Sequence, residues 1–135
     1  MATISFKGDP IHTAGDLPAV GSDAPAFVLT DADLAEISDK DLRGTQLVLN
    51  VFPSLDTSVC AASVRRFNQA AAGLSKTEVL CISADLPFAQ KRFCEAEGIK
   101  HVRPLSTFRH PAFGDAYGLW IADGPLPGLL ARAVI

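Results

Sequence analysis

Apolar runs and helical patterns alternate through the middle of the chain. Residues 47–52 form a short apolar run that stops at Pro53, which cannot continue a hydrogen-bonded ladder, so this run predicts a buried strand. A helical pattern follows over residues 57–72, then a second strand over 78–83 and a second helix over 87–97. Such alternation predicts right-handed β-α-β units and an α/β domain with a largely parallel central sheet covered by helices.

Weaker patterns flank this central unit. Near the N-terminus, Ile4 and Phe6 alternate with polar neighbours before a break at residues 8–10, and the pattern resumes at Ile11, which predicts a β-hairpin. The whole chain, residues 1–135, is expected to form a single domain. The remaining expected elements are a strand at 26–29, an irregular stretch at 31–44 that ends in one helical turn, strands at 102–106 and 119–122, a short helix at 111–117 and a final apolar stretch at 129–135.

The sequence also predicts the ends and the buried face of the second helix. Asp85 is a favourable N-cap residue, Pro87 suits the first turn, and Gly98 is placed to end the helix. The expected buried stripe consists of four apolar residues at helical spacing, namely Leu86, Ala89, Phe93 and Ala96.

Composition and charge narrow the classes of function. Of 135 residues, 48% are hydrophobic and 20% are charged, as is typical of a folded globular domain. The net charge of −3 gives no electrostatic reason to expect nucleic acid or an anionic membrane as a partner. No apolar run approaches the roughly 20 residues of a membrane span. The N-terminus lacks the layout of a signal peptide, so we expect a cytoplasmic protein.

Three cysteines, Cys60, Cys81 and Cys94, carry the main chemical signal. Their odd number argues against a fixed disulfide framework, and no two of them form a C-x-x-C pair. The histidines are not at metal-ligand spacings either, so we expect no metal and no cofactor. In a reducing cytoplasm, cysteines that pair are expected to do so transiently, for redox chemistry.

Cys60 lies where a sulfur should be reactive. If Thr57 is the N-cap of the first predicted helix, Cys60 is its third residue, in a turn whose backbone N–H groups have no partner within the helix. These donors and the helix dipole favour a thiolate, so the pKa of Cys60 is expected to fall well below the value of about 8.5 for a free cysteine. From the residues alone, a small buried apolar side chain explains Cys60 equally well.

The motif around Cys60 resembles that of a known family. Pro53, Thr57 and Cys60 match the Pro-x-x-x-Thr-x-x-Cys motif of peroxiredoxins, in which the cysteine attacks the peroxide. A longer resemblance, to the bacterial thiol peroxidases, which are atypical two-cysteine peroxiredoxins, is carried by residues 50–68, 80–90 and 122–126. It implies a thioredoxin-like fold with an N-terminal β-hairpin. It also implies a peroxidase that reduces hydrogen peroxide or organic hydroperoxides, forms an intramolecular disulfide and is recycled by thioredoxin, and we expect a homodimer.

Each residue near Cys60 has a role implied by this resemblance and a plainer alternative. The Thr57 hydroxyl would accept a hydrogen bond from the thiol or donate one to the peroxide, or it would only cap the helix. Pro53 would wall the pocket and shield the thiolate from water, or would only end the strand. Arg132 matches an arginine that lies against the reactive sulfur in this family; otherwise its side chain extends to solvent.

Oxidised Cys60 would be a sulfenic acid that must condense with a second thiol. Cys81 lies in the middle of a predicted buried strand and is expected to be inert, whereas Cys94 lies on the second predicted helix, in a segment better able to unwind. The resemblance also assigns the resolving role to Cys94. Because a disulfide needs Cα atoms within about 7 Å, local unfolding of one or both helices is expected during the cycle.

The resemblance has one gap and leaves alternatives open. Thiol peroxidases continue through another strand and a C-terminal helix, so we expect this chain to be C-terminally truncated, less stable and more prone to associate. A truncated, poorly active module that acts by association is therefore the alternative to an enzyme. A thioredoxin-type oxidoreductase is disfavoured because the C-x-x-C pair is absent.

Two further groups of side chains also have two interpretations each. Arg65 and Arg66 are expected on a solvated helix face, or one of them orients a substrate or an interface. Four phenylalanines would line an apolar cleft suited to larger hydroperoxides, or would belong to the core: Phe27, Phe52, Phe88 and Phe93.

Overall fold

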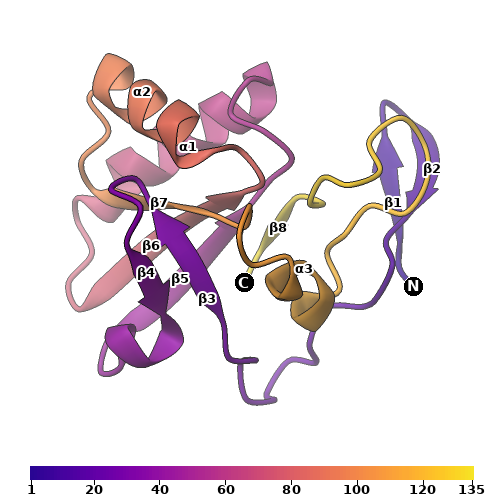
Figure 1. Ribbon diagram of the computed structural model, residues 1–135, viewed down its shortest axis with the longest axis horizontal. Coiled ribbons are helices and arrows are strands. Elements are labelled where there is room, and N and C mark those ends of the chain that lie inside the picture. Colours follow the sequence, from indigo (N-terminus) through magenta and orange to yellow (C-terminus); the bar gives the residue numbers. More distant parts are fainter.

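A six-stranded mixed sheet with the order β4-β3-β7-β6-β5-β8 forms the centre of the molecule (Figure 1). The computed structural model describes residues 1–135. The strands are β3 (Val28–Asp31), β4 (Glu36–Ser38), β5 (Gln46–Val51), β6 (Thr77–Ser83), β7 (Val102–Ser106) and β8 (Ala133–Val134). Strands β5, β6 and β7 are parallel, whereas β3, β4 and β8 pair antiparallel with their neighbours. The α/β class is confirmed. The sheet is mixed rather than largely parallel, because three of its strands pair antiparallel, and an antiparallel pair needs no crossover helix that the sequence pattern would reveal.

Three α-helices cover the sheet, namely α1 (Ser58–Ala71), α2 (Pro87–Glu97) and α3 (Ala112–Tyr117). Helices α1 and α2 lie over one face and α3 lies over the other (Figure 1). Side chains of β6 alternate between the two faces, as strand geometry requires. Val79 and Cys81 pack in the cluster that includes α1, whereas Leu80 and Ile82 pack in the cluster that includes α3. The strand-helix alternation predicted from the middle of the sequence is therefore confirmed.

The predicted N-terminal hairpin is present as a separate two-stranded sheet. It consists of β1 (Thr3–Phe6) and β2 (Asp9–His12), with Ile4 opposite Ile11. Its turn is Lys7–Gly8, one residue earlier than the predicted break, and both turn residues have positive φ, 51° and 86°. Two such residues match the twist of the flanking strands, as in a type I′ turn.

The hairpin packs against the loop that leads to β8. Ile11 belongs to the same apolar cluster as Ile121, and Leu126 packs against this cluster. Gly124 makes the close approach possible, because a Cβ at this position would lie 2.6 Å from the Cγ2 atom of Ile11. The N-terminal hairpin and the loop before β8 therefore lie side by side, to one side of the central sheet (Figure 1).

Four predicted segments differ from the structure. The strand expected at 26–29 is β3 and starts two residues later, and the irregular stretch 31–44 contains β4 as well as the expected helical turn, η1 (Asp39–Leu42). Residues 119–122 form only isolated bridges, to Thr13 and Leu130, and residues 129–135 are a strand only at β8. Residues 119–122 form hydrogen bonds with the end of the hairpin and with residues 129–131. Apolar periodicity in the sequence does not distinguish such local pairing from a strand of the main sheet.

The predicted buried stripe of α2 is only partly confirmed. Leu86 and Ala96 are exposed, whereas Ala89 and Phe93 are half-buried, and Phe93 packs against the cluster that includes α1. The buried residues of the helix are Pro87 and Gln90. Gln90 determines this orientation, because its side-chain amide donates hydrogen bonds to the Leu105 carbonyl and the Ser83 hydroxyl, at 2.9 and 3.2 Å. Asp85 does not cap the helix, and the N-cap residue is Leu86. The predicted stop at Gly98 is confirmed, with a φ of 64°.

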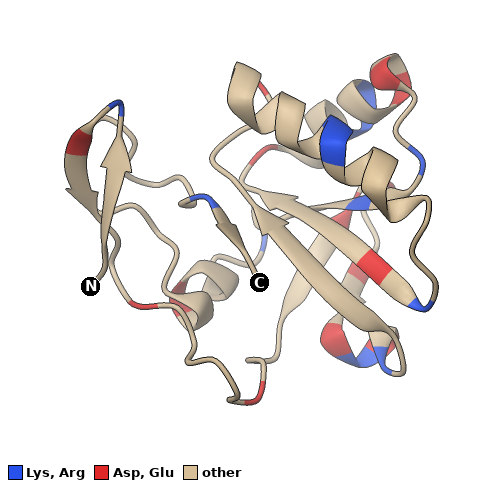
Figure 2. Cartoon of the chain, turned by 180° about the vertical axis from the view of Figure 1, so that it is seen from behind, with Lys and Arg blue, Asp and Glu red and all other residues tan.

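Charged residues of both signs are interspersed over the helices, strands and loops (Figure 2). Several form ion pairs between elements, for example Arg65 with Glu97 at 2.7 Å and Arg103 with Glu78 at 3.1 Å. Separately, none of the helices has both the length and the apolar composition that crossing a membrane requires.

Candidate active site

Cys60 lies at the N-terminal end of α1, as its place in the sequence predicted. Thr57 is the N-cap residue, with extended backbone angles, and the bond from the Ala61 N–H to the Thr57 carbonyl, at 3.0 Å, closes the first turn. The N–H groups of Ser58, Val59 and Cys60 precede this bond and have no partner within the helix. Cys60 is 2% exposed, so it is largely shielded from water in the helical turn that contains these unpaired donors.

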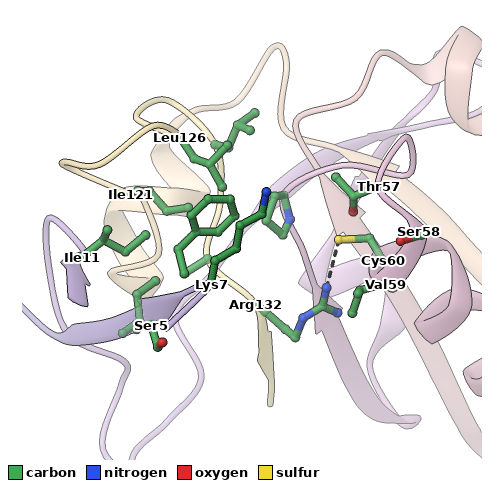
Figure 3. Close-up of a pocket in the computed structure, with 15 residues that line it drawn as sticks. Ser5, Lys7, Ile11, Thr57, Ser58, Val59, Cys60, Ile121, Leu126 and Arg132 are labelled. Atoms are coloured by element: carbon green, nitrogen blue, oxygen red, sulfur yellow. Dashed lines mark hydrogen bonds between the residues drawn. The ribbon is translucent and has the colours of Figure 1, made fainter. Parts of the chain in front are cut away.

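Arg132 donates a hydrogen bond from Nη2 to the Sγ atom of Cys60 at 3.0 Å (Figure 3). The contact depends on the pairing of β8 with β5, in which Ala133 lies opposite Val51. Arg132 is therefore level with the end of β5, where the chain turns through Pro53 towards α1. A guanidinium is always charged and can only donate, so the sulfur is the acceptor, and a thiolate is the better acceptor of its two forms.

The Thr57 hydroxyl does not cap α1. Its Oγ1 atom donates to the carbonyl of Ser54 at 3.0 Å, and the side chain makes no cap bond. In Figure 3 the hydroxyl oxygen points towards the sulfur of Cys60. Because the hydroxyl proton is already donated to Ser54, the lone pairs of the oxygen remain available to accept a hydrogen bond from a molecule bound beside the sulfur.

A pocket of about 650 Å³ opens beside the Cys60 sulfur. Pro53, Thr57 and Arg132 line it together with Cys60, so the structure brings four of the five predicted site residues together. The opposite wall comes from the hairpin and the loop that packs on it, and its residues are mostly apolar: Ile4, Ser5, Phe6, Lys7, Ile11, Ile121, Leu126 and Leu129.

The hairpin wall was missed from the sequence. The Lys7 side chain extends from the turn across the pocket towards the Cys60 side (Figure 3), and its ammonium lies 5.4 Å from the centre of the Phe6 ring. None of the four phenylalanines proposed from the sequence lines this pocket. Phe27 and Phe52 are buried in the two clusters and Phe88 is exposed. No local signal in the first twelve residues points to contact with a segment some fifty positions away.

Asp85 is a second residue whose place was not predicted. Its carboxylate accepts hydrogen bonds from the Ser54 hydroxyl at 2.7 Å, the Leu55 N–H at 2.8 Å and the Ser83 hydroxyl at 2.7 Å. A signal did exist, because Asp85 and Ser54 each follow one of two neighbouring parallel strands, whose carboxyl ends lie at one edge of the sheet. The carboxylate thus holds the loop between β5 and α1 against the start of α2.

The other two thiols lie outside the pocket. Cys81 is buried in β6, and burial raises its pKa to about 12, partly offset by a hydrogen bond from the Asn50 amide at 3.7 Å. Cys94 is half-buried on α2, and burial raises its pKa to about 11. All three cysteines are free thiols, and no hydrogen bond joins Cys94 to Cys60. The fifth predicted site residue therefore lies apart from the other four.

Arg65 links the two helices near Cys94. It pairs with Glu97 of α2 at 2.7 Å, and its guanidinium lies 5.8 Å from the centre of the Phe93 ring. Arg65 is exposed, as expected, and its guanidinium also bridges α1 and α2. No group of three His, Cys, Asp or Glu side chains is arranged to hold a metal ion.

Comparison with known proteins gives consistent matches. The Redoxin family model matches residues 19–135. The thiol peroxidase of Mycobacterium tuberculosis is 58% identical over 135 residues, which are 100% of this chain and 81% of that protein. The thiol peroxidase of Corynebacterium glutamicum is 55% identical with the same coverage. Among solved structures, the peroxiredoxin-like protein from Aquifex aeolicus has a TM-score of 0.91 and 41% identity, covering 98% of this chain and 77% of that chain.

Proposed function

This chain belongs to the redoxin family, and from that membership and the geometry around Cys60 we propose that it is a thiol-dependent peroxidase. The predicted thioredoxin-like fold with an N-terminal hairpin is confirmed. The observation that carries the proposal is the hydrogen bond from Arg132 to the Cys60 sulfur at 3.0 Å, in a pocket at a helix N-terminus. The alternative of a poorly active module that acts by association has no support in the comparisons.

The first chemical step is an attack of the Cys60 thiolate on a hydroperoxide. A lone pair of the sulfur forms an S–O bond to one peroxide oxygen while the O–O bond breaks. The second oxygen leaves as an alkoxide or hydroxide and takes up a proton, which gives an alcohol or water and leaves Cys60 as a sulfenic acid. Arg132 and the unpaired N–H groups of the first helical turn stabilise the thiolate and the negative charge that develops on the oxygens.

Thr57 and Pro53 are proposed to orient the substrate. With its own proton donated to Ser54, the Thr57 oxygen accepts the hydrogen bond of the peroxide O–H and so directs one oxygen towards the sulfur. Pro53 contributes an apolar wall with no N–H group that would attract water. Both roles are supported by their position in the pocket and by the resemblance of the Pro53 to Cys60 motif to that of peroxiredoxins.

The second step is proposed to join Cys60 to Cys94. The Cys94 sulfur displaces the hydroxyl of the sulfenic acid, so an S–S bond forms, the S–O bond breaks, and the thiol proton leaves with the hydroxyl as water. Because the two thiols are not in contact in the reduced chain, local unfolding of α1 or α2 must precede this step. Cys81 is a weaker candidate, since burial raises its pKa to about 12 and encloses its side chain.

The substrate is a hydroperoxide, and the mostly apolar pocket supports organic hydroperoxides as well as hydrogen peroxide. We propose thioredoxin as the reductant, because a protein dithiol regenerates such a disulfide by thiol–disulfide exchange. A homodimer is supported by the exposed apolar side chains of Val59, Leu86 and Phe88 at the starts of the two helices. The three free thiols support the cytoplasm as the location, since thiols stay reduced there.

The test is peroxide consumption in the presence of thioredoxin, thioredoxin reductase and NADPH. Cys60→Ser is expected to abolish consumption, because serine has no nucleophilic thiolate at neutral pH. Cys81→Ser, the matched control, is expected to keep most of the activity. Turnover by folded Cys60→Ser protein would refute the proposal.

A further inference from the structure

The carboxylate of Asp85 joins the two segments that carry the proposed reactive cysteines. On one side it accepts from the Ser54 hydroxyl and the Leu55 N–H, both in the loop that leads to Cys60. On the other side it accepts from Ser83, at the end of β6, directly before the start of α2. Three donors at 2.7–2.8 Å on one carboxylate form a network of charge-assisted bonds.

The loop side of this network supports the Cys60 turn. The Ser54 carbonyl accepts from both the N–H and the hydroxyl of Thr57, at 3.2 and 3.0 Å. The Ser54 hydroxyl, besides donating to Asp85, accepts from the Asp56 N–H at 3.1 Å. Asp85 therefore holds the residue that in turn holds Thr57, the N-cap of the helix whose first turn contains Cys60.

The α2 side of the network is equally well anchored. The backbone carbonyl of Asp85 accepts from the Ser106 hydroxyl at 2.5 Å, and Ser83 also accepts from the buried side-chain amide of Gln90. The next carbonyl, that of Leu86, accepts from the Ala89 and Gln90 N–H groups and so closes the first turn of α2. Cys94 lies two turns further along this helix.

We propose that Asp85 is a positioning residue that keeps Cys60 in its peroxide-reactive arrangement and delays the approach of Cys94. The inference rests on the proposed function, in which the Cys60 sulfenic acid condenses with the Cys94 thiol and releases water. That condensation needs the loop or α2 to move, and such a movement breaks the bonds from Ser54 and Leu55 to Asp85. The carboxylate takes no part in the proton transfers; it sets how long the sulfenic acid persists.

The test measures the two steps separately in the full chain. Sulfenic acid formation and disulfide formation are followed after one equivalent of peroxide by rapid quench, dimedone trapping and mass spectrometry. In Asp85→Asn, disulfide formation is expected to be about tenfold faster, the factor that about 1.4 kcal/mol produces, because the loop opens more readily. Sulfenic acid formation is expected to be unchanged or slower. Over-oxidation to sulfinic acid is expected to fall, since the sulfenic acid is consumed sooner.

Two further variants make the result specific. Ser54→Ala removes one of the two loop-side bonds to Asp85 and should also accelerate disulfide formation. The double variant should give less than the product of the two effects. Glu78→Gln is the matched control, because it makes the same change from carboxylate to amide within β6. It affects an ion pair with Arg103 and none of the bonds to Asp85. It should leave both steps unchanged.

The outcomes separate this inference from the proposed function. A wild-type chain that forms no Cys60–Cys94 disulfide would refute the proposed function itself. A wild-type chain that forms this disulfide, with Asp85→Asn and Ser54→Ala equal to it or slower in that step, would overturn the role of Asp85. A merely structural role would slow both steps and lower the unfolding temperature without the opposite changes expected here.

Discussion

Arg132 and Cys60 are 72 positions apart in the sequence, yet the guanidinium donates a hydrogen bond to the sulfur at 3.0 Å. The antiparallel pairing of β8 with β5 produces this contact, because it aligns the residue before β8 with the end of the strand that leads to the Cys60 helix. Two groups of donors therefore surround the Cys60 sulfur. The helix N-terminus is local in sequence, whereas the arginine comes from the residue directly before the last strand.

Replacing this arginine should slow the reaction with peroxide. Arg132→Met removes the charge and the donor, and we expect the second-order rate constant for sulfenic acid formation to fall about 10²-fold, the effect of losing one such donor in other active sites. For Arg132→Lys we expect a rate constant between those of the wild type and Arg132→Met, because an ammonium keeps the charge but lacks the planar arrangement of donors. Stopped-flow measurement tests this, with Arg66→Met on the exposed face of α1 as the control. Equal rates for Arg132→Met and Arg66→Met would contradict the assignment.

Thr57 should act through its oxygen rather than as a helix cap. Thr57→Val keeps the shape but loses the hydroxyl that points to the sulfur and bonds to Ser54, so we expect the same rate constant to fall by about 10 to 100-fold. Thr57→Ser should retain most of it. Helix content by circular dichroism should change little in either variant, since the side chain makes no cap bond. A loss of helix content that parallels the loss of rate would instead support capping.

The pKa values of the other two thiols predict a strong selectivity of alkylation. Burial raises the pKa of Cys94 to about 11 and that of Cys81 to about 12, so at pH 8 only about one molecule in 10³ or 10⁴ carries the respective thiolate. Iodoacetamide should therefore modify Cys60 first in the native chain, and labelling of Cys94 should rise about tenfold per pH unit between pH 8 and 10. Rapid labelling of Cys94 at pH 8 in native protein would contradict this expectation.

The same shift predicts that the folded chain loses stability at alkaline pH. The pKa of Cys94 is about 11 when folded and 9.0 for the ordinary thiol, so above pH 9 the unfolded chain releases a proton that the folded chain retains. The stability that the protonated Cys94 thiol gives the folded chain is fully present below pH 9 and is lost as the pH rises towards 11. Urea unfolding of wild type and Cys94→Ser at pH 8 and 10 measures it. The serine variant should show the smaller fall in the free energy of unfolding.

Oxidation of the wild-type chain should give an intramolecular disulfide between Cys60 and Cys94. On the chain-entropy model, a crosslink that closes a loop of about 35 residues stabilises the folded state by about 3–4 kcal/mol, offset in part by the unwinding of helix turns. Cys94→Ser should react once with peroxide and then accumulate sulfenic and over-oxidised sulfur. Peptide mapping under non-reducing conditions decides the pairing, and a Cys60–Cys81 bond would overturn it.

The hairpin wall should matter more for bulky substrates than for hydrogen peroxide. Phe6→Ala removes apolar surface from the side of the pocket that faces Cys60, so we expect the rate with cumene hydroperoxide to fall severalfold. Hydrogen peroxide is too small to contact this wall, and its rate should be nearly unchanged. Leu17→Ala, at a residue that is 50% exposed, is the control. An equal loss with both substrates would show that Phe6 acts on the fold and not on specificity.

The sequence by itself determined the local part of the site. The strand end, Pro53, the N-cap and Cys60 follow one another closely along the chain, and each depends on rules of strand and helix termination that act over a few residues. The same holds for the hairpin, for Gly98 at the end of α2 and for the strand-helix alternation of the central unit. Arg132 was placed at the sulfur only through a family resemblance, not through any local rule.

Only the tertiary structure decided which distant residues complete the site. The mixed sheet, the hairpin wall, the network of Asp85 and the face that α2 buries all depend on strand order and register, which bring together residues tens of positions apart. The α2 helix shows the physical reason. Hydrophobic periodicity predicted that Leu86 would be buried, but α2 buries Gln90 instead, and the Gln90 NH2 group donates hydrogen bonds to Leu105 and Ser83. Apolar spacing cannot predict this face, because the acceptors that a buried NH2 group needs lie on strands of the sheet.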